Sequence, residues 1–170
     1  MQCSDAELVE AACAGDIDSF RKLYERYYGM AVGIARSRLA DQHLAEDAAQ
    51  EAFATACRRL YSLRDPQRFP EWLGTICRRT ASRMARSQTN GAPIKSEPIS
   101  PVNVDDCRRA QVHEALNHLS RSEREIIHLH YFSGLSYDEV ARVLGISPQA
   151  VHGRLQRARR KLAIRISKSE

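Results

Sequence analysis

Apolar residues recur at steps of three and four along most of this chain, and this period constrains the fold more than any other feature. Such steps keep one face of an α-helix apolar, whereas a half-buried strand needs alternation. With 8 Gly and 6 Pro in 170 residues, a turn-dense all-β fold is disfavoured. We therefore expect an all-α protein. The clearest stripe comprises Phe20, Leu23, Tyr24, Tyr27, Met30, Ala31, Ile34 and Ala35.

Four helical segments are expected in the first half of the chain. They cover residues 5–14, a segment from about residue 18, residues 41–61 and residues 70–86. Gly15-Asp16 separates the first two, and Pro66 and Pro70 interrupt the chain before the fourth because proline lacks a backbone N–H. The third helix is expected to turn small residues inward, so that a neighbour can approach closely. That face comprises Leu44, Ala48, Ala49, Ala52, Phe53, Ala56, Cys57 and Leu60.

The composition changes after this first half. Residues 88–104 contain three Pro, two Ser and a Gly and show no hydrophobic period, which is typical of a flexible linker. Helical patterns resume at residue 105. The sequence therefore predicts two small helical domains, residues 1–87 and 105–170, joined by a flexible linker over residues 88–104.

Helix-start signals recur in the second domain. Ser120–Glu123 and Ser136–Glu139 both have the pattern of a capping box, in which each end residue satisfies a backbone N–H of the other. Gly145 follows the second of these helices at the position where a left-handed residue ends a helix. Ser147-Pro148 then reads as the N-cap and first residue of a final helix that reaches about Ile166.

The last two helices have the pattern of a helix-turn-helix. Ala141 is small where the second helix must cross the first, and Gly145 permits the tight turn between them. Arginine can reach guanine acceptors in a DNA major groove, glutamine can reach adenine, and a helix N-terminus favours phosphate. The alternative is a generic three-helix bundle with an Arg-rich exterior. The candidate DNA-contacting residues are Ser147, Gln149, His152, Gly153, Arg154, Arg157 and Arg160.

The net charge of +5 is unevenly distributed. Residues 1–57 carry five basic and ten acidic groups, residues 58–86 carry eight arginines against two acids, and residues 150–168 carry seven basic groups and no acid. Two basic blocks predict two contacts with a polyanion, and the acidic segment predicts a different partner. Solvated helix faces are the alternative explanation.

The sequence offers no constellation for catalysis or metal binding. The 5 Cys include no CxxC pair and the 6 His include no HExxH motif, so we expect no metal, no cofactor and no catalytic residue. Cys57 and Cys77 are expected to fill the core. A nucleic-acid enzyme therefore remains only a distant alternative. No membrane-length apolar run and no secretory pattern occur, so a cytoplasmic protein is expected.

Two groups of motifs resemble one known family. GLSYDEVARVLGISPQAVHGRLQRARRKL resembles sigma region 4, while AEDAAQEAFATACRRL and FPEWLGTICRRTASRMAR resemble sigma region 2. Together they resemble the extracytoplasmic-function (ECF) sigma factors of the sigma-70 family. Family members often have Lys-Ser where this chain has His152-Gly153, a departure that concerns base preference. The C-terminal motif alone also resembles LuxR-type regulators, so a stand-alone helix-turn-helix regulator is the alternative.

The resemblance implies a promoter-specificity subunit without enzymatic activity. Its expected partners are core RNA polymerase, through the β′ coiled coil and the β flap, promoter DNA, and an inhibitory anti-sigma factor. The final helix would read the −35 element. The implied polymerase-binding residues are Asp47, Gln50, Glu51 and Phe53. The implied −10 contacts are Arg58, Arg59, Arg64, Arg68, Arg78, Arg79 and Arg83.

The irregular segment from Tyr61 to Phe69 is expected to hold a pocket for an unstacked base. Trp72 either stacks on such a base or belongs to the core, of which we favour the core. Tyr61 and Phe69 either support the loop or touch DNA. About eighteen extended linker residues would reach ~60 Å, and sites ~17 base pairs apart lie ~58 Å apart. The linker can therefore just span two promoter elements.

Overall fold

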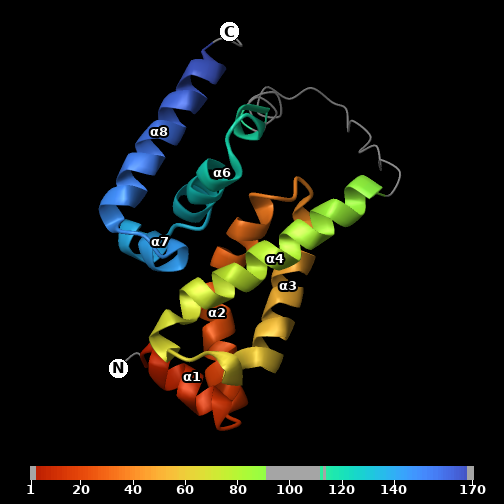
Figure 1. The fold of residues 1–170 in the computed structure, drawn as a ribbon, viewed down its shortest axis with the longest axis vertical. Coiled ribbons are helices and arrows are strands. Elements are labelled where there is room, and N and C mark those ends of the chain that lie inside the picture. The colour runs from red at the N-terminus through yellow and green to blue at the C-terminus, as the bar shows by residue number, and fades with distance from the viewer. Residues whose placement is uncertain (1–2, 91–111, 113, 168–170) are drawn as a thin grey trace.

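The computed structural model describes residues 3–90, 112 and 114–167, and these form helices and turns without a strand. We call residues 3–90 the N-terminal part and the described residues from 112 onward the C-terminal part (Figure 1). The elements are α1 (Asp5–Cys13), α2 (Ile17–Arg36), α3 (Gln42–Arg59), α4 (Phe69–Asn90), α6 (Arg121–Ile127), α7 (Tyr137–Leu144) and α8 (Pro148–Ile166). Two short turns lie between α3 and α4, η1 (Leu60–Ser62) and η2 (Pro66–Arg68), and the π-turn η3 (His128–Phe132) directly follows α6. The all-α prediction is confirmed.

Helix α4 is longer than predicted. It continues to Asn90, so the first residues assigned to the linker are helical. Residues 91–104 of the predicted linker, and residues 105–111 after it, lie outside the described residues.

Local capping explains where the first helices begin. Ser4 forms a capping box with Glu7, and Asp16 and Asp41 cap α2 and α3 by accepting backbone N–H groups. Gly15 has φ +100°, a conformation that ends α1 and that side chains with a Cβ rarely adopt. The break predicted at Gly15-Asp16 is therefore confirmed.

The core of the N-terminal part lies between α2, α3 and α4. Leu23 and Ile34 of α2 and Leu73 of α4 are fully buried. The alanine face of α3 is buried as well, which lets its neighbours pack closely. Cys77 is buried as predicted, but Cys57 is exposed. The prediction for Cys57 was wrong because it lies one position beyond the alanine face, turned toward solvent.

The C-terminal part contains the predicted helix-turn-helix. Ser120 and Ser136 each form the expected capping box, and Gly145 ends α7 with φ +64° and ψ +38°. Ser147 then caps α8, where its Oγ accepts the N–H of Ala150 at 3.2 Å. The core positions Val140, Val151 and Leu155 are buried, while Leu144 and Ile146 pack at its edge.

The two parts contact one another, which the sequence did not predict. Helix α7 packs on α4, and η3 packs on α2, so one hydrophobic cluster continues from the N-terminal part into the C-terminal part. In Figure 1 α8 points away from the N-terminal helices and lies against α6 and α7. Arg157 is exposed and Arg154 is partly exposed, so neither is enclosed in this shared core. Within the described ranges, no helix has both the length and the apolar character needed to cross a membrane.

Candidate nucleic-acid interface

The first candidate surface is the N-terminal half of α8. Its apolar side is fixed because Val151, Leu155 and Ala158 are buried against α6 and α7. The opposite side carries the predicted DNA-contacting residues. Ser147, Gln149, His152, Arg157 and Arg160 are exposed, and Gly153 and Arg154 are partly exposed.

This surface is strongly basic. Lys161 of α8 forms an ion pair with Glu123 of α6 at 2.6 Å. That pair fastens α8 to α6. Arg154 and Arg157 have no such carboxylate partner among the described residues, so their charges are available to a phosphate or a base edge.

The second candidate surface is a cavity of about 450 Å³ between the loop after α3 and the first turns of α4. The chain leaves α3 through η1, and Asp65 then caps η2 by accepting the N–H of Gln67 at 3.0 Å. Pro66 starts η2, which runs directly into α4. This irregular path forms one side of the cavity, at the place where a pocket was expected. Its walls comprise Arg59, Ser62, Leu63, Arg64, Asp65, Arg68, Glu71, Trp72, Thr75, Ile76 and Arg79.

The arginines of this cavity differ in their pairing. Arg68 lies beside Glu71, with Nη2 and Nε at 2.6 and 3.0 Å from one carboxylate oxygen. This hydrogen bonding raises the pKa of Arg68. Arg59, Arg64 and Arg79 make no ion pair with any described residue. The cavity therefore presents three unneutralised cations beside an apolar wall.

Three aromatic residues lie at or near the cavity and differ in their exposure to solvent. Phe69 is fully buried, and its ring centroid lies 6.1 Å from that of Trp72. Trp72 is partly buried and packs on the core, as favoured from the sequence, and it also lines the cavity. Its stacking on a base stays a prediction. Tyr61 is 82% exposed beside the loop. Phe69 thus supports the loop, while Tyr61 is free to contact a ligand.

Three of the predicted −10 arginines point away from the cavity. Arg58 donates to Thr55 Oγ1 at 3.3 Å along α3. Arg83 pairs with Glu51 of α3, and Arg78 pairs with Glu125 of the C-terminal part. Of the seven arginines predicted to contact the −10 element, three therefore do not line the cavity. The four that do are Arg59, Arg64, Arg68 and Arg79.

The predicted polymerase-binding residues lie on α3. Asp47, Gln50 and Glu51 are exposed on one side of the helix. Phe53 is buried, with its ring centroid 4.7 Å from Tyr24 and 6.5 Å from Phe20. It supports this face from inside the bundle rather than being presented on it.

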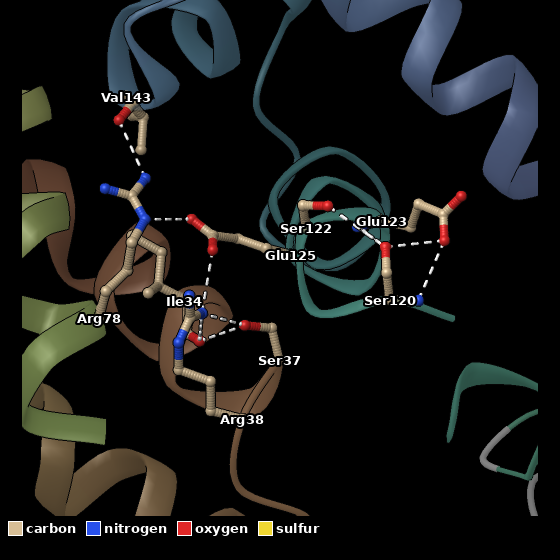
Figure 2. A network of polar contacts seen from close by, with 9 residues as sticks. All are labelled: Ile34, Ser37, Arg38, Arg78, Ser120, Ser122, Glu123, Glu125 and Val143. Atoms are coloured by element: carbon tan, nitrogen blue, oxygen red, sulfur yellow. Dashed lines mark hydrogen bonds and ion pairs between the residues drawn. The ribbon is translucent and has the colours of Figure 1, made fainter. Parts of the chain in front are cut away.

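Sequence reasoning missed a polar cluster between the two parts (Figure 2). Glu125 of α6 is 3% exposed; its Oε1 accepts from Arg78 Nε at 2.7 Å, and its Oε2 lies 2.9 Å from Arg38 Nη1. Arg78 Nη2 also donates to the carbonyl of Val143 at 3.1 Å. The one available signal was a carboxylate four positions before Leu129, on the apolar side of its helix.

Within the described ranges, no three His, Cys, Asp or Glu side chains lie close enough together to hold a metal ion. The candidate surfaces are instead basic and partly apolar, which suits an anionic polymer with stacking bases.

Comparison with known families agrees with this arrangement. Residues 23–91 match the family described as Sigma-70 region 2, and residues 109–162 match Sigma-70, region 4. The basic cavity lies in the first match and the helix-turn-helix in the second.

Individual relatives carry the same description. The chain is 32% identical over 171 residues to the ECF RNA polymerase sigma factor BldN of Streptomyces coelicolor, covering 92% of this chain and 64% of BldN. It is 30% identical over 163 residues to the ECF RNA polymerase sigma factor SigM of Mycobacterium tuberculosis, covering 94% and 83%. The chain thus spans just under two thirds of BldN but most of SigM.

A solved structure has a similar fold. CnrH, in complex with the cytosolic domain of CnrY, superposes with a TM-score of 0.70 and 29% identity, covering 98% of this chain and 99% of that one.

Proposed function

Because the chain belongs to the ECF group of the sigma-70 family, we propose that it binds core RNA polymerase and directs initiation at promoters with a −10 and a −35 element. It contributes no catalysis of its own, and it acts in the cytoplasm, where the polymerase and the chromosome are found. The alternative of a stand-alone LuxR-like regulator is not favoured, because region 2 is matched as well as region 4.

The observation that carries this proposal is the basic cavity between η1 and α4. Opening a duplex requires a place for an unstacked base and cations along the exposed strand. The cavity of about 450 Å³ offers Trp72 for stacking and Arg59, Arg64 and Arg79 for phosphates. Arg58 lies outside this cavity and is proposed to contact the strand beyond it. Arg68, Arg78 and Arg83 join the set only where a phosphate displaces their carboxylate partners.

Helix α8 is proposed to enter the major groove of the −35 element. Its capped N-terminus meets the backbone phosphates, and Gln149, His152, Arg154, Arg157 and Arg160 face the bases and the strand. Gly153 has room for a side chain, because a Cβ there meets only Arg157 at 3.6 Å. Gly153 therefore leaves this part of the helix surface open to DNA.

The polymerase is proposed to bind the exposed side of α3, through Asp47, Gln50 and Glu51, by its β′ coiled coil, with the β flap held by the C-terminal part. CnrH is known in complex with the cytosolic domain of CnrY. By analogy, we propose that an anti-sigma factor also binds this chain.

Two variants with opposite expected defects test the proposal. Arg154→Ala with Arg157→Ala should abolish transcription in vitro from a −35-dependent promoter while leaving binding to core polymerase intact. Asp47→Lys should weaken co-purification with core polymerase, and it leaves the Glu51–Arg83 pair in place. The two variants are expected to lose different activities, promoter-dependent transcription in one and core binding in the other, so each serves as the control for the other.

The outcomes separate the candidate functions. Loss of core binding in the arginine variant refutes the division of labour between α3 and α8. Strong binding of duplex promoter DNA by the purified chain without polymerase indicates the stand-alone regulator instead.

A further inference from the structure

We propose that the contact between the two parts is a built-in lock: the free chain adopts a closed form that cannot engage both promoter elements, and Glu125 is the residue that holds it closed. This inference rests on the proposed function. It adds a regulatory step that neither candidate DNA surface contains by itself.

The closed form brings the two candidate DNA surfaces too close together. Glu71 lines the basic cavity, and it also lines a second cavity of about 410 Å³ together with Gly145 and Pro148 at the start of α8. Elements separated by ~17 base pairs are ~58 Å apart along a duplex. The two surfaces must therefore move apart before one promoter can bind both.

The polar cluster ties the two parts together by charge. Each carboxylate oxygen of Glu125 faces one arginine of the N-terminal part, Arg38 from the turn after α2 and Arg78 from α4 (Figure 2). A buried carboxylate is stable only when it is paired, so the contact with both arginines favours the closed form. In the open form all three groups can return to water.

Closing also removes one arginine from the proposed DNA contacts. Arg78 is shared between Glu125 and the carbonyl of Val143 in α7, and it cannot meet a phosphate while it holds both. Opening therefore frees a cation for the −10 strand at the same step that separates the two surfaces.

Gly33 indicates that the sequence accommodates this contact. A Cβ on Gly33 of α2 would lie 2.3 Å from Ser133 Oγ, whose hydroxyl donates to the carbonyl of Gly29 at 2.9 Å. Gly74 of α4 has more room, since a Cβ there would lie 3.4 Å from Val143, an ordinary contact distance. Glycine is a poor helix former, yet it occupies position 33, where any larger residue would clash with Ser133 of the C-terminal part.

Small-angle scattering of the full, free chain tests the lock directly. A compact chain of this length has a radius of gyration of ~16 Å, whereas two bodies of ~12 Å each with centres ~40 Å apart give ~23 Å. We expect the unmodified chain to lie near the lower value. Glu125→Gln and Arg38→Gln should both move it toward the higher value with unchanged helical content.

Glu123→Gln is the matched control, because Glu123 lies on the same helix but pairs with Lys161 inside the C-terminal part. It should leave the radius of gyration unchanged. An expanded unmodified chain, or equal radii for Glu125→Gln and the unmodified chain, overturns the lock.

Two glycine variants test the lock by steric clash, without changing any charge. Gly33→Leu should force the parts apart, whereas Gly29→Leu, one turn earlier on the same helix, has open space around its Cβ and should not. Equal radii for these two variants contradict the lock even if Glu125→Gln fails to fold.

Binding to core polymerase separates this inference from the proposed function. Apparent affinity falls in proportion to the open fraction, so Glu125→Gln should bind core polymerase more tightly by the reciprocal of that fraction. Expansion without polymerase binding by any variant refutes the proposed function and leaves the lock standing. Polymerase binding with no difference in radius refutes the lock alone.

Discussion

Replacing Arg64 by Gln should weaken the salt dependence of binding to single-stranded −10 DNA, whereas the same change at Arg68 should not. Both arginines line the basic cavity, and they lie four residues apart. Arg64 makes no ion pair with a described residue, whereas Arg68 is neutralised by Glu71. A phosphate that binds Arg64 displaces only salt ions, but at Arg68 it must first displace a carboxylate.

The size of the effect follows from the number of free cations. Each phosphate neutralised on a single strand contributes a slope of about 0.7 to the fall of log K with log salt. Between ~50 and ~200 mM salt, this amounts to a ~2.6-fold loss of affinity per arginine. Arg59, Arg64 and Arg79 together account for a ~18-fold loss, and the Arg64→Gln variant should retain ~7-fold.

Fluorescence anisotropy with reconstituted holoenzyme and a labelled non-template −10 strand measures these slopes. Glu71→Gln is an informative partner variant, because it frees Arg68 and should steepen the slope by about 0.7. Equal slopes for Arg64→Gln and Arg68→Gln would falsify the reasoning from ion pairing. A flat response in the unmodified holoenzyme would refute phosphate contacts by the cavity altogether.

Three further predictions concern the fold. Gly145→Ala should lower the free energy of unfolding in urea by ~1–2 kcal/mol, since its φ of +64° is left-handed; an unchanged midpoint contradicts this. Hydrogen bonds from Ser136 lower the pKa of Glu139, so the capping box stabilises above the unfolded pKa and is lost as pH falls through the folded pKa. Ser136→Ala should cost about 1 kcal/mol near neutral pH and flatten the acid limb of a stability–pH curve. In thiol labelling at pH 8, exposed Cys57 should react rapidly, whereas Cys77, whose pKa burial raises to about 12, should react only on unfolding.

Much of the fold was predictable because its signals are local. Both C-terminal capping boxes and the left-handed Gly145 are set by hydrogen bonds and backbone angles within a few residues. The helix-turn-helix follows from them, since the buried side of α8 needs only the 3.6-residue period. Cys57 shows the limit of that period. When the buried face of a helix is predicted from the sequence, its edge is uncertain by one residue. One residue corresponds to a rotation of 100° around the helix axis, which is enough to turn a side chain from the core toward solvent.

The candidate site divides in the same way. The order of residues shows that a basic loop follows α3. It does not show which group each arginine contacts. Arg78 and Arg79 are neighbours in the sequence, yet one faces Glu125 and the other lines the cavity. Similarly, Phe53 belongs to the helix that carries the proposed polymerase-binding face but is buried beneath it.

The sequence by itself determined the helices, their caps, the two groups of family motifs and the basic character of both candidate DNA surfaces, because each depends on residues close together in the chain. The tertiary structure decided which cations are free and how the two parts meet. Glu125 lies 47 residues from Arg78, and no local pattern reports which distant charge will neutralise a buried carboxylate. That pairing exists only once the two parts have packed together.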